Sequence, residues 1–378
     1  MTDQLTEVTT TGWGKRIINS FVGVLVGLAL FFISFIVLWK TEGRTDFAKL
    51  AQKAVIASPS SIDQNAQEQL ASVTGPLETV ELVGDPDFIS PGKYLILTRR
   101  AEMFAWRERV STKTQKNTGG SETTTKTYSY EKGWTENPEN SGDFKQPEGH
   151  ANPPPAIRSQ TFSARQAQVG VYELDMERIS LPSTEPLGLG GGKILLEKTK
   201  GYTVTEEYLF KGQGSLADPQ VGDTRLSFYA LSSGRRATVF GKLSGGMLDP
   251  YFYNGEKSFY RAFLGARDEA IATLKGEYKA AGWIGRIIGF LMMWIGLLML
   301  TGPLHTILDV LPFLGSASRF VIGLVAFPIA LVLSAATIIV SMVAHNIIVL
   351  LIVLALIAGL VLYLFRARKK PPAAAQAQ

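Results

Sequence analysis

Four long apolar runs limit what this chain can fold into. One lies near the N-terminus and three follow one another toward the C-terminus, at residues 17–38, 284–300, 320–344 and 347–365. A helix needs about 20 apolar residues to cross the hydrocarbon core of a bilayer, and each run is close to or above that length. The sequence therefore predicts a multi-pass α-helical membrane protein with four transmembrane helices, arranged one plus three.

The first run has the features of a retained anchor. A cleaved secretory signal has an apolar core of about 7 to 15 residues, followed by small residues at the cleavage site. Here the core continues to Leu38 without such a site, and Trp13 and Trp39 flank it where amphipathic rings favour the membrane interface. We therefore expect a helix that stays in the mature protein.

Basic residues flank the first and the last run. Lys15 and Arg16 precede the first run, and the last is followed by Arg366, Arg368, Lys369 and Lys370. Positive charge near helix ends is retained on the cytoplasmic side, and four crossings return both termini to one side. We therefore expect both termini in the cytoplasm, although Lys40 and Arg44 weaken this expectation at the first helix. These basic flanks are also candidates for contacts with anionic lipid headgroups.

These signals divide the chain into alternating polar and apolar parts. The predicted parts are a cytoplasmic N-terminus 1–16, a helix 17–39, an extracytoplasmic domain 40–282, a helix 283–301, a cytoplasmic amphipathic connection 302–318, helices 319–344 and 346–365, and a basic cytoplasmic tail 366–378. The net charge of +5 comes partly from that tail. Basic residues without a nucleic-acid reading element do not indicate nucleic-acid binding, so no such partner is expected.

The middle domain is rich in strand signals. Apolar residues at helical spacing in 45–57 predict an amphipathic helix, on the membrane or packed on the core. A long hairpin is expected at 104–134, around the turn Asn117-Thr118-Gly119-Gly120. Further strands are expected at 93–98, 169–174, 193–196, 202–210, 225–231 and 235–243, with a helix at 257–281. The sequence predicts a large, strand-rich α+β domain, in one or two subdomains.

A loop rich in proline, glycine and asparagine spans residues 137–155, and loops carry binding surfaces more often than strands do. Aromatic residues lie beside it in the sequence. Together they predict a candidate interaction surface made by Tyr128, Tyr130, Trp134, Gly149, His150, Asn152 and Pro153. The alternative is that these rings cap the core of the domain, which is the more common role of aromatic side chains.

Five short segments, in order, resemble one family. They are AEMFAW at 101–106, YSY at 128–130 with Trp134, GHANP at 149–153, VGDTRLSF at 221–228 and AAGW at 280–283. With the one-plus-three layout, they identify the chain as similar to the LUMA, or transmembrane protein forty-three, family. The piece from His305 to Leu314, with Asp309 and Pro312, is similar to that family's connection between its second and third helices.

The resemblance implies a membrane protein without an established enzyme activity. In animals it implies residence in the endoplasmic reticulum and inner nuclear membrane, a lumenal domain, self-association, and the organisation of other membrane proteins, including emerin. This chain departs in its polar hairpin tip and alanine-rich tail, and it has no cysteine. The absence of cysteine and the alanine-rich composition favour a bacterial member, which has no emerin as a partner and lies in the cytoplasmic (inner) membrane with the large domain outside.

Catalytic and metal-binding patterns are weak. The segment 187–193 lacks the glycine and the hydroxyl residue of a phosphate-binding loop. The three histidines are scattered and cysteine is absent, so neither a metal nor a cofactor is expected. Adjacent acids, Asp85 with Asp87 and Glu206 with Glu207, leave an acid–base enzyme as an alternative.

The apolar runs themselves carry packing signals. Gly23 and Gly27, and Gly285 and Gly289, are spaced four apart, which lets helices approach closely, within one chain or between two. The runs hold almost no ionisable residue, whereas transporters keep such groups for their ions or substrates. We therefore expect a non-enzymatic scaffold that self-associates and contacts lipids and other membrane proteins, with an envelope enzyme and a transporter or channel component as alternatives.

Overall fold

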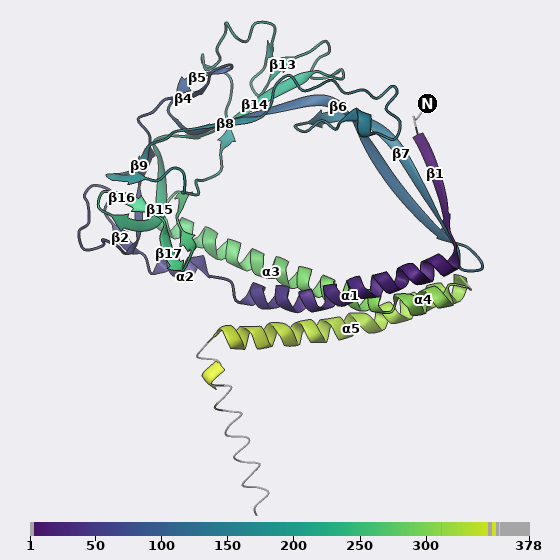
Figure 1. The fold of residues 1–378 in the computed structure, drawn as a ribbon. Coiled ribbons are helices and arrows are strands. Elements are labelled where there is room, and N and C mark those ends of the chain that lie inside the picture. The colour runs from purple at the N-terminus through teal and green to yellow at the C-terminus, as the bar shows by residue number, and fades with distance from the viewer. Residues whose placement is uncertain (1–3, 311, 347–349, 353–354, 356–378) are drawn as a thin grey trace, which may run out of the picture. The chain divides into compact units, whose positions relative to one another are not determined.

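The computed structural model describes residues 4–310, 312–346, 350–352 and 355. Its chain divides into two compact units. The strand unit comprises Met1–Val8, Asp46–Lys113 and Thr125–Gly276, and the helix unit comprises Thr9–Thr45, Thr114–Thr124 and Glu277–Gln378. Figure 1 shows their elements. The predicted combination of apolar helices with a strand-rich domain is confirmed.

The larger sheet is built around one long hairpin. Its eight strands follow the order β1-β7-β6-β14-β13-β12, with β8 beside β6 and β11 beside β14. Their bounds are β1 Gln4–Thr11, β6 Tyr94–Lys116, β7 Glu122–Thr135, β8 Gln160–Ser163, β11 Glu185–Pro186, β12 Thr203–Val204, β13 Leu209–Lys211 and β14 Thr224–Ser232. Every second residue of β6 from Leu95 to Ala105 is buried, as the two-residue period of a strand requires. The predicted hairpin is thus confirmed.

The second sheet has seven strands in the order β19-β15-β16-β10-β9-β3-β2, and β15 also pairs with β3. Their bounds are β2 Val55–Ala57, β3 Leu70–Glu78, β9 Ala167–Val169, β10 Tyr172–Leu174, β15 Arg235–Ser244, β16 Met247–Asp249 and β19 Arg261–Leu264. Two small sheets pair β4 Val83–Asp85 with β5 Ile89–Gly92, and β17 Tyr251–Asn254 with β18 Lys257–Phe259. A 3-10 turn, η1, spans Ser141–Asp143.

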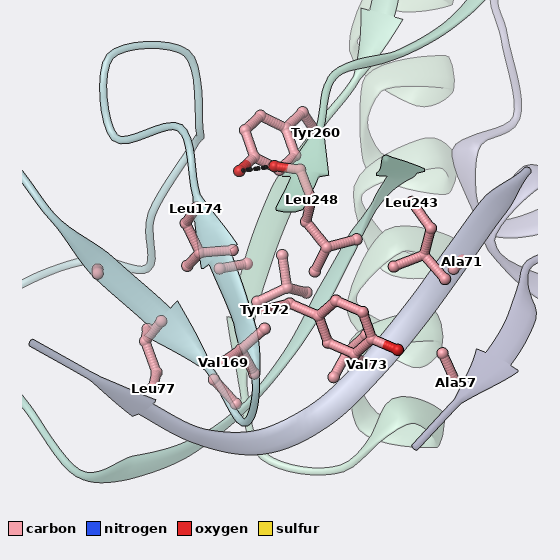
Figure 2. Packing of buried hydrophobic residues seen from close by; sticks show 14 of the residues in the cluster. Ala57, Ala71, Val73, Leu77, Val169, Tyr172, Leu174, Leu243, Leu248 and Tyr260 are labelled. Carbon is pink, nitrogen blue, oxygen red and sulfur yellow. Dashed lines mark hydrogen bonds between the residues drawn. The ribbon is translucent and has the colours of Figure 1, made fainter. Parts of the chain in front are cut away.

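The second sheet packs its apolar side chains into a core that Figure 2 shows from close by. Tyr260 lies in this core with 4 % of its surface exposed. Its hydroxyl donates to the Leu248 carbonyl oxygen at 2.6 Å and accepts from the Asp175 backbone N–H at 2.9 Å. Burial raises the pKa of Tyr260, so the hydroxyl keeps its proton and its donor role.

Replacing Tyr260 by Phe should lower the free energy of unfolding by about 1–3 kcal/mol, because the buried Leu248 carbonyl oxygen then loses this donor. The measurement is the midpoint of urea unfolding. Tyr251→Phe is the control, because no hydrogen bond from the Tyr251 hydroxyl is found in the part of the chain that the structure describes. Equal midpoints for the two variants would contradict the structural role of the Tyr260 hydroxyl.

A short helix, α2 (Phe47–Gln52), follows the first long helix. Asp46 caps it by accepting a hydrogen bond from the Lys49 N–H at 3.1 Å. Ala48 and Ala51 are buried in the same cluster as Phe259 and Leu274. Of the two predicted roles for 45–57, packing on the core is therefore the one observed, and residues 55–57 form β2 instead of helix.

The helix unit holds the apolar helices. Their bounds are α1 Trp13–Glu42, α3 Arg267–Leu300, α4 Gly302–Leu308 and α5 Pro312–His345. Three segments, Trp13–Gln52, Arg267–Leu300 and Phe320–His345, are long and apolar enough to cross a membrane. The predicted fourth span, 346–365, and the basic tail lie almost entirely outside the described residues. The number of crossings therefore stays a prediction.

Three local predictions differ from the structure. Residues 193–196 form no strand, only an isolated bridge between Ile194 and Ile89, because glycines and turns flank them. The predicted helix 257–281 begins only at Arg267, and β18 and β19 precede it. Residues 4–11, where no strand was predicted, form β1 at the edge of the larger sheet.

Candidate functional site

The loop predicted as an interaction surface folds onto the base of the long hairpin. His150 has 1 % of its surface exposed. Its ring stacks on Tyr130, with ring centres 3.9 Å apart, and meets the edge of Trp106 at 4.7 Å. Its Nδ1 lies 3.0 Å from the Gln146 carbonyl oxygen, and its backbone N–H donates to the Pro147 carbonyl oxygen. The histidine thus holds the loop to the strands.

Asn152 ties the same loop to β6. Its Oδ1 accepts from the Trp106 N–H at 2.8 Å, and its Nδ2 donates to the carbonyl oxygens of Trp106 and Glu139. The side chain thereby pairs with the Trp106 backbone as a neighbouring strand would. The Tyr130 hydroxyl donates to Glu108 at 2.8 Å and accepts from the Gln146 N–H at 2.9 Å. The polar groups of Asn152 and Tyr130 therefore form hydrogen bonds within the domain.

The remaining predicted loop residues fall into separate clusters. Trp134 packs on Phe104, and the Arg225 guanidinium lies 4.6 Å from its ring centre. Pro153 packs close to Gly222, whose φ of 98° favours glycine. Gly149 also has a positive φ, of 81°. The contacts are those of rings that cap the domain, and a binding role for this loop stays a prediction.

Tyr128 belongs to a contact with β1 that sequence reasoning missed. Its hydroxyl donates to Glu7 at 3.0 Å, and the Lys145 ammonium lies 3.4 Å from the other Glu7 oxygen. The Tyr128 hydrogen bond, and then the Lys145 charge, lower the pKa of Glu7 below its ordinary value of 4.5. The β-branched residues of β1, Val8 and several threonines, were the available signal, but polar side chains dominate the segment.

Acid should loosen β1. A carboxyl whose pKa is lower in the folded state than in the unfolded state stabilises the fold at pH values above its unfolded pKa, which is near 4.5 for Glu7. This stabilisation is lost as the pH falls through the pKa of the folded state. We expect amide hydrogen exchange of residues 4–11, corrected for the intrinsic rate at each pH, to accelerate below about pH 4.5. Glu7→Gln should remove this step, and a step of the same size in the variant would contradict the assignment.

The four glycines predicted to pack the apolar helices do not all lie against a neighbouring helix. A Cβ at Gly27 would lie 2.7 Å from the Met299 Cβ and 2.9 Å from the Gly296 carbonyl oxygen. Gly285 and Gly289 meet α1 as closely, at Thr41 and Leu38, whereas no atom of the described residues lies within 4 Å of a Cβ at Gly23. Three of the four predicted glycines therefore pack α1 against α3 within one chain.

A polar cluster joins the hairpin tip to the ends of two helices, all within the helix unit. Asp309 has no exposed surface, and its carboxylate accepts from Arg16 at 2.6 Å and from Lys116. The Gly119 N–H donates to the Val310 carbonyl oxygen at 3.1 Å. We call Arg16, Lys116 and Asp309 the tip cluster. Arg16, predicted to contact lipid headgroups, thus has a carboxylate partner, while Lys15 is exposed.

These contacts bear on the predicted sides of the membrane. The prediction places residues 1–16 and 302–318 on the opposite side from 40–282. In the structure β1 joins the sheet that contains β6 and β7, and the tip cluster joins residues from all three predicted parts. The side of the membrane on which each of these parts lies stays a prediction.

One open hollow in the strand unit is lined by cations. Its volume is about 540 Å³, and Phe88, Arg158, Lys198, Tyr202 and Lys211 are among its lining residues. Behind them, Arg99 donates to the Asp85 carboxylate at 2.7 Å, and both side chains are almost fully buried. Asp85, predicted as half of an acid pair, is therefore neutralised by Arg99. No group of three metal-ligating His, Asp or Glu residues occurs among the residues that the structure describes.

Known proteins resemble most of this chain. The family profile described as Transmembrane protein 43 matches residues 103–347. Transmembrane protein 43 of Rattus norvegicus is 28 % identical over 335 residues, covering 84 % of this chain and 82 % of its own length. The protein of the same name in Mus musculus is 28 % identical over 86 % of this chain and 84 % of its own length.

A more distant relative extends the range of organisms. The Transmembrane protein 43 homolog of Drosophila melanogaster is 26 % identical over 82 % of this chain and 86 % of its own length. No solved structure matches the chain. Because the family profile covers more than half of the sequence, the chain belongs to the transmembrane protein 43 family.

Proposed function

We propose that this protein is a non-enzymatic membrane scaffold that self-associates and organises lipids or other membrane proteins through its strand unit. The observation that most supports this proposal concerns three carboxylates that are fully or almost fully buried. Each of them has hydrogen-bond or ion-pair partners inside the fold. Asp85 pairs with Arg99, and Asp309 pairs with Arg16 and Lys116. Asp223 accepts from three backbone N–H groups, those of Gln213, Gly214 and Gln220. Carboxylate oxygens that are already bound by cations or backbone N–H groups are poorly placed to exchange a proton with a substrate.

The cationic hollow supports a contact with an anionic partner. Arg158 and Lys198 are exposed at its rim, and the Lys211 ammonium lies 5.1 Å from the ring centre of Tyr202. Together with Arg99 they outnumber the one acid in the lining, Asp87. A phosphate or carboxylate would gain several charge-assisted hydrogen bonds there. We assign the hollow to an anionic headgroup or an acidic segment of a membrane protein.

The apolar helices support self-association. Phe21, Leu25 and Phe32 on α1, and Phe320 and Leu324 on α5, each have more than half of their surface exposed. Together these helices present more apolar surface than soluble proteins leave uncovered, so lipid or a second copy must cover it. We propose that a second copy covers part of it, with the cytoplasmic membrane of a bacterium as the site of the assembly and the large domain outside the cell.

The test is to purify the full chain from native membranes in mild detergent, measure the particle mass, and identify the lipids and proteins that remain bound. We expect an assembly larger than one chain with specific companions. His150→Ala should loosen the loop and release companions, whereas the exposed Glu148→Ala should not. A single-chain particle without companions would contradict the scaffold, and turnover of a lipid or glycan that is lost in Asp87→Asn, at an exposed acid of the predicted pair, would establish the enzyme instead.

A further inference from the structure

We infer that α1 and α3 lie within one leaflet of the membrane, with their axes along its plane, so that they embed in the bilayer without crossing it. The partner of this surface is the acyl chains of a single leaflet. The inference concerns how the chain meets the membrane, and it goes beyond the scaffold role. It rests on where the two ends of each helix are connected.

The connections of α1 place both of its ends on one side. β1 ends at Thr11, in the sheet that also contains β6 and β7, and α1 begins at Trp13. The helix ends at Glu42, and the chain re-enters the strand unit at Asp46. A helix of 30 residues is about 45 Å long, more than the roughly 30 Å hydrocarbon core. A crossing α1 would need strands of one sheet on opposite sides of the bilayer.

The connections of α3 give the same result. At its start, the Arg267 guanidinium donates to the Ala51 carbonyl oxygen at 3.0 Å, within the strand unit. At its end, α3 leads through α4 to Asp309, which pairs with Lys116 at the tip of the β6–β7 hairpin. Both ends of α3 are therefore held by residues of the segment 46–276.

The hairpin cannot carry its tip through the bilayer. The distal part of its strands holds Arg107, Glu108, Arg109 and Lys113 on β6, with Lys126 on β7. Ionisable side chains are costly in hydrocarbon, and an open sheet edge there leaves backbone N–H and C=O groups without partners. The hairpin tip thus stays on the side of the strand unit, and so do the residues that bind it.

The composition of α1 fits an in-plane helix. Basic residues flank both ends, with Lys15 and Arg16 before the apolar stretch and Lys40 at its end, whereas a crossing helix concentrates them on one side. Trp13 and Trp39, at the two ends, are 37 % and 42 % exposed. In an in-plane helix both tryptophans reach the same interface. Gly27, Ser34 and Leu38 are buried, and the other faces are left for acyl chains.

Single cysteines test this arrangement directly, because the native chain has none. Gly12→Cys precedes α1, Thr118→Cys lies at the hairpin tip, and Lys53→Cys follows α1 in the strand unit; all three positions are exposed. In sealed vesicles, a membrane-impermeant maleimide should label all three from the same side. Labelling of Gly12→Cys and Lys53→Cys from opposite sides would overturn the inference and restore a crossing α1.

Depth along α1 gives a second, independent measurement. Nitroxide labels at Ile18, Leu25, Phe32 and Trp39, each on an exposed position, report depth through their relaxation by oxygen and by a water-soluble nickel complex. An in-plane helix gives similar depths at all four positions. A crossing helix gives the greatest depth near Leu25 and Phe32 and the least at both ends, and that profile would overturn the inference. Neither readout depends on self-association, so the scaffold proposal stands or fails separately.

Discussion

Replacing Asp309 by Asn should release the hairpin tip from the helix ends. The carboxylate has no exposed surface and faces the Arg16 guanidinium at 2.6 Å and the Lys116 ammonium. The amide keeps the shape of the side chain but leaves the two cations beside each other, with Glu122, 3.5 Å from Arg16, as the remaining acid. Removing one partner of a buried ion pair costs about 3–5 kcal/mol, so amide exchange of residues 114–124 should accelerate by at least about a hundredfold.

Two further variants make this result specific. Asp218→Asn changes an exposed acid of the strand unit and should leave the exchange of residues 114–124 unchanged. Adding Lys116→Met to Asp309→Asn removes one of the two facing cations, so it should restore part of the protection. If Asp309→Asn exchanges at the rate of the native chain, the tip cluster does not hold the hairpin.

Local patterns sufficed for the regular elements. Short runs of β-branched and aromatic residues and the turn at residues 117–120 predicted the hairpin. The structure adds that one face of β6 is buried along much of its length. The residues of β18 and β19 misled the same reasoning. Phe259, Ala262 and Phe263 recur at helical spacing, yet they are buried as parts of strands. Short strands offer too few residues for a period to be read.

Contacts between residues that are far apart in the sequence could not be predicted from local sequence patterns. Arg16, Lys116 and Asp309 come from three distant parts of the sequence, and only their meeting gives Asp309 a role. The available signal was an acid beside apolar runs, which requires a partner wherever it is buried. For the loop around His150, the sequence indicated a feature but not the way it packs. Its composition predicted a distinct feature, but the burial of His150 under Tyr130 and Trp106 depends on packing that composition does not specify.

Gly27→Leu should lower the free energy of unfolding by about 3 kcal/mol, because α1 and α3 must move apart to admit the side chain. A Cβ alone would lie 2.9 Å from the Gly296 carbonyl oxygen, and backbone cannot swing aside as a flexible side chain can. The measurement is the midpoint of thermal unfolding of the full chain in mild detergent. A midpoint equal to that of the native chain would contradict close packing at Gly27.

Gly23→Leu is the matched control from the same helix and the same motif. In the part of the chain that the structure describes, a Cβ there meets no atom within 4 Å, and leucine favours helix over glycine by about 1 kcal/mol. The midpoint should therefore stay the same or rise. The particle mass of this variant tests a second possibility, because among the described residues none packs against a Cβ at Gly23. A smaller particle with an unchanged midpoint of thermal unfolding would place Gly23 at the interface between two copies of the chain. Gly27 would then pack helices within one chain, and Gly23 would pack helices of two chains.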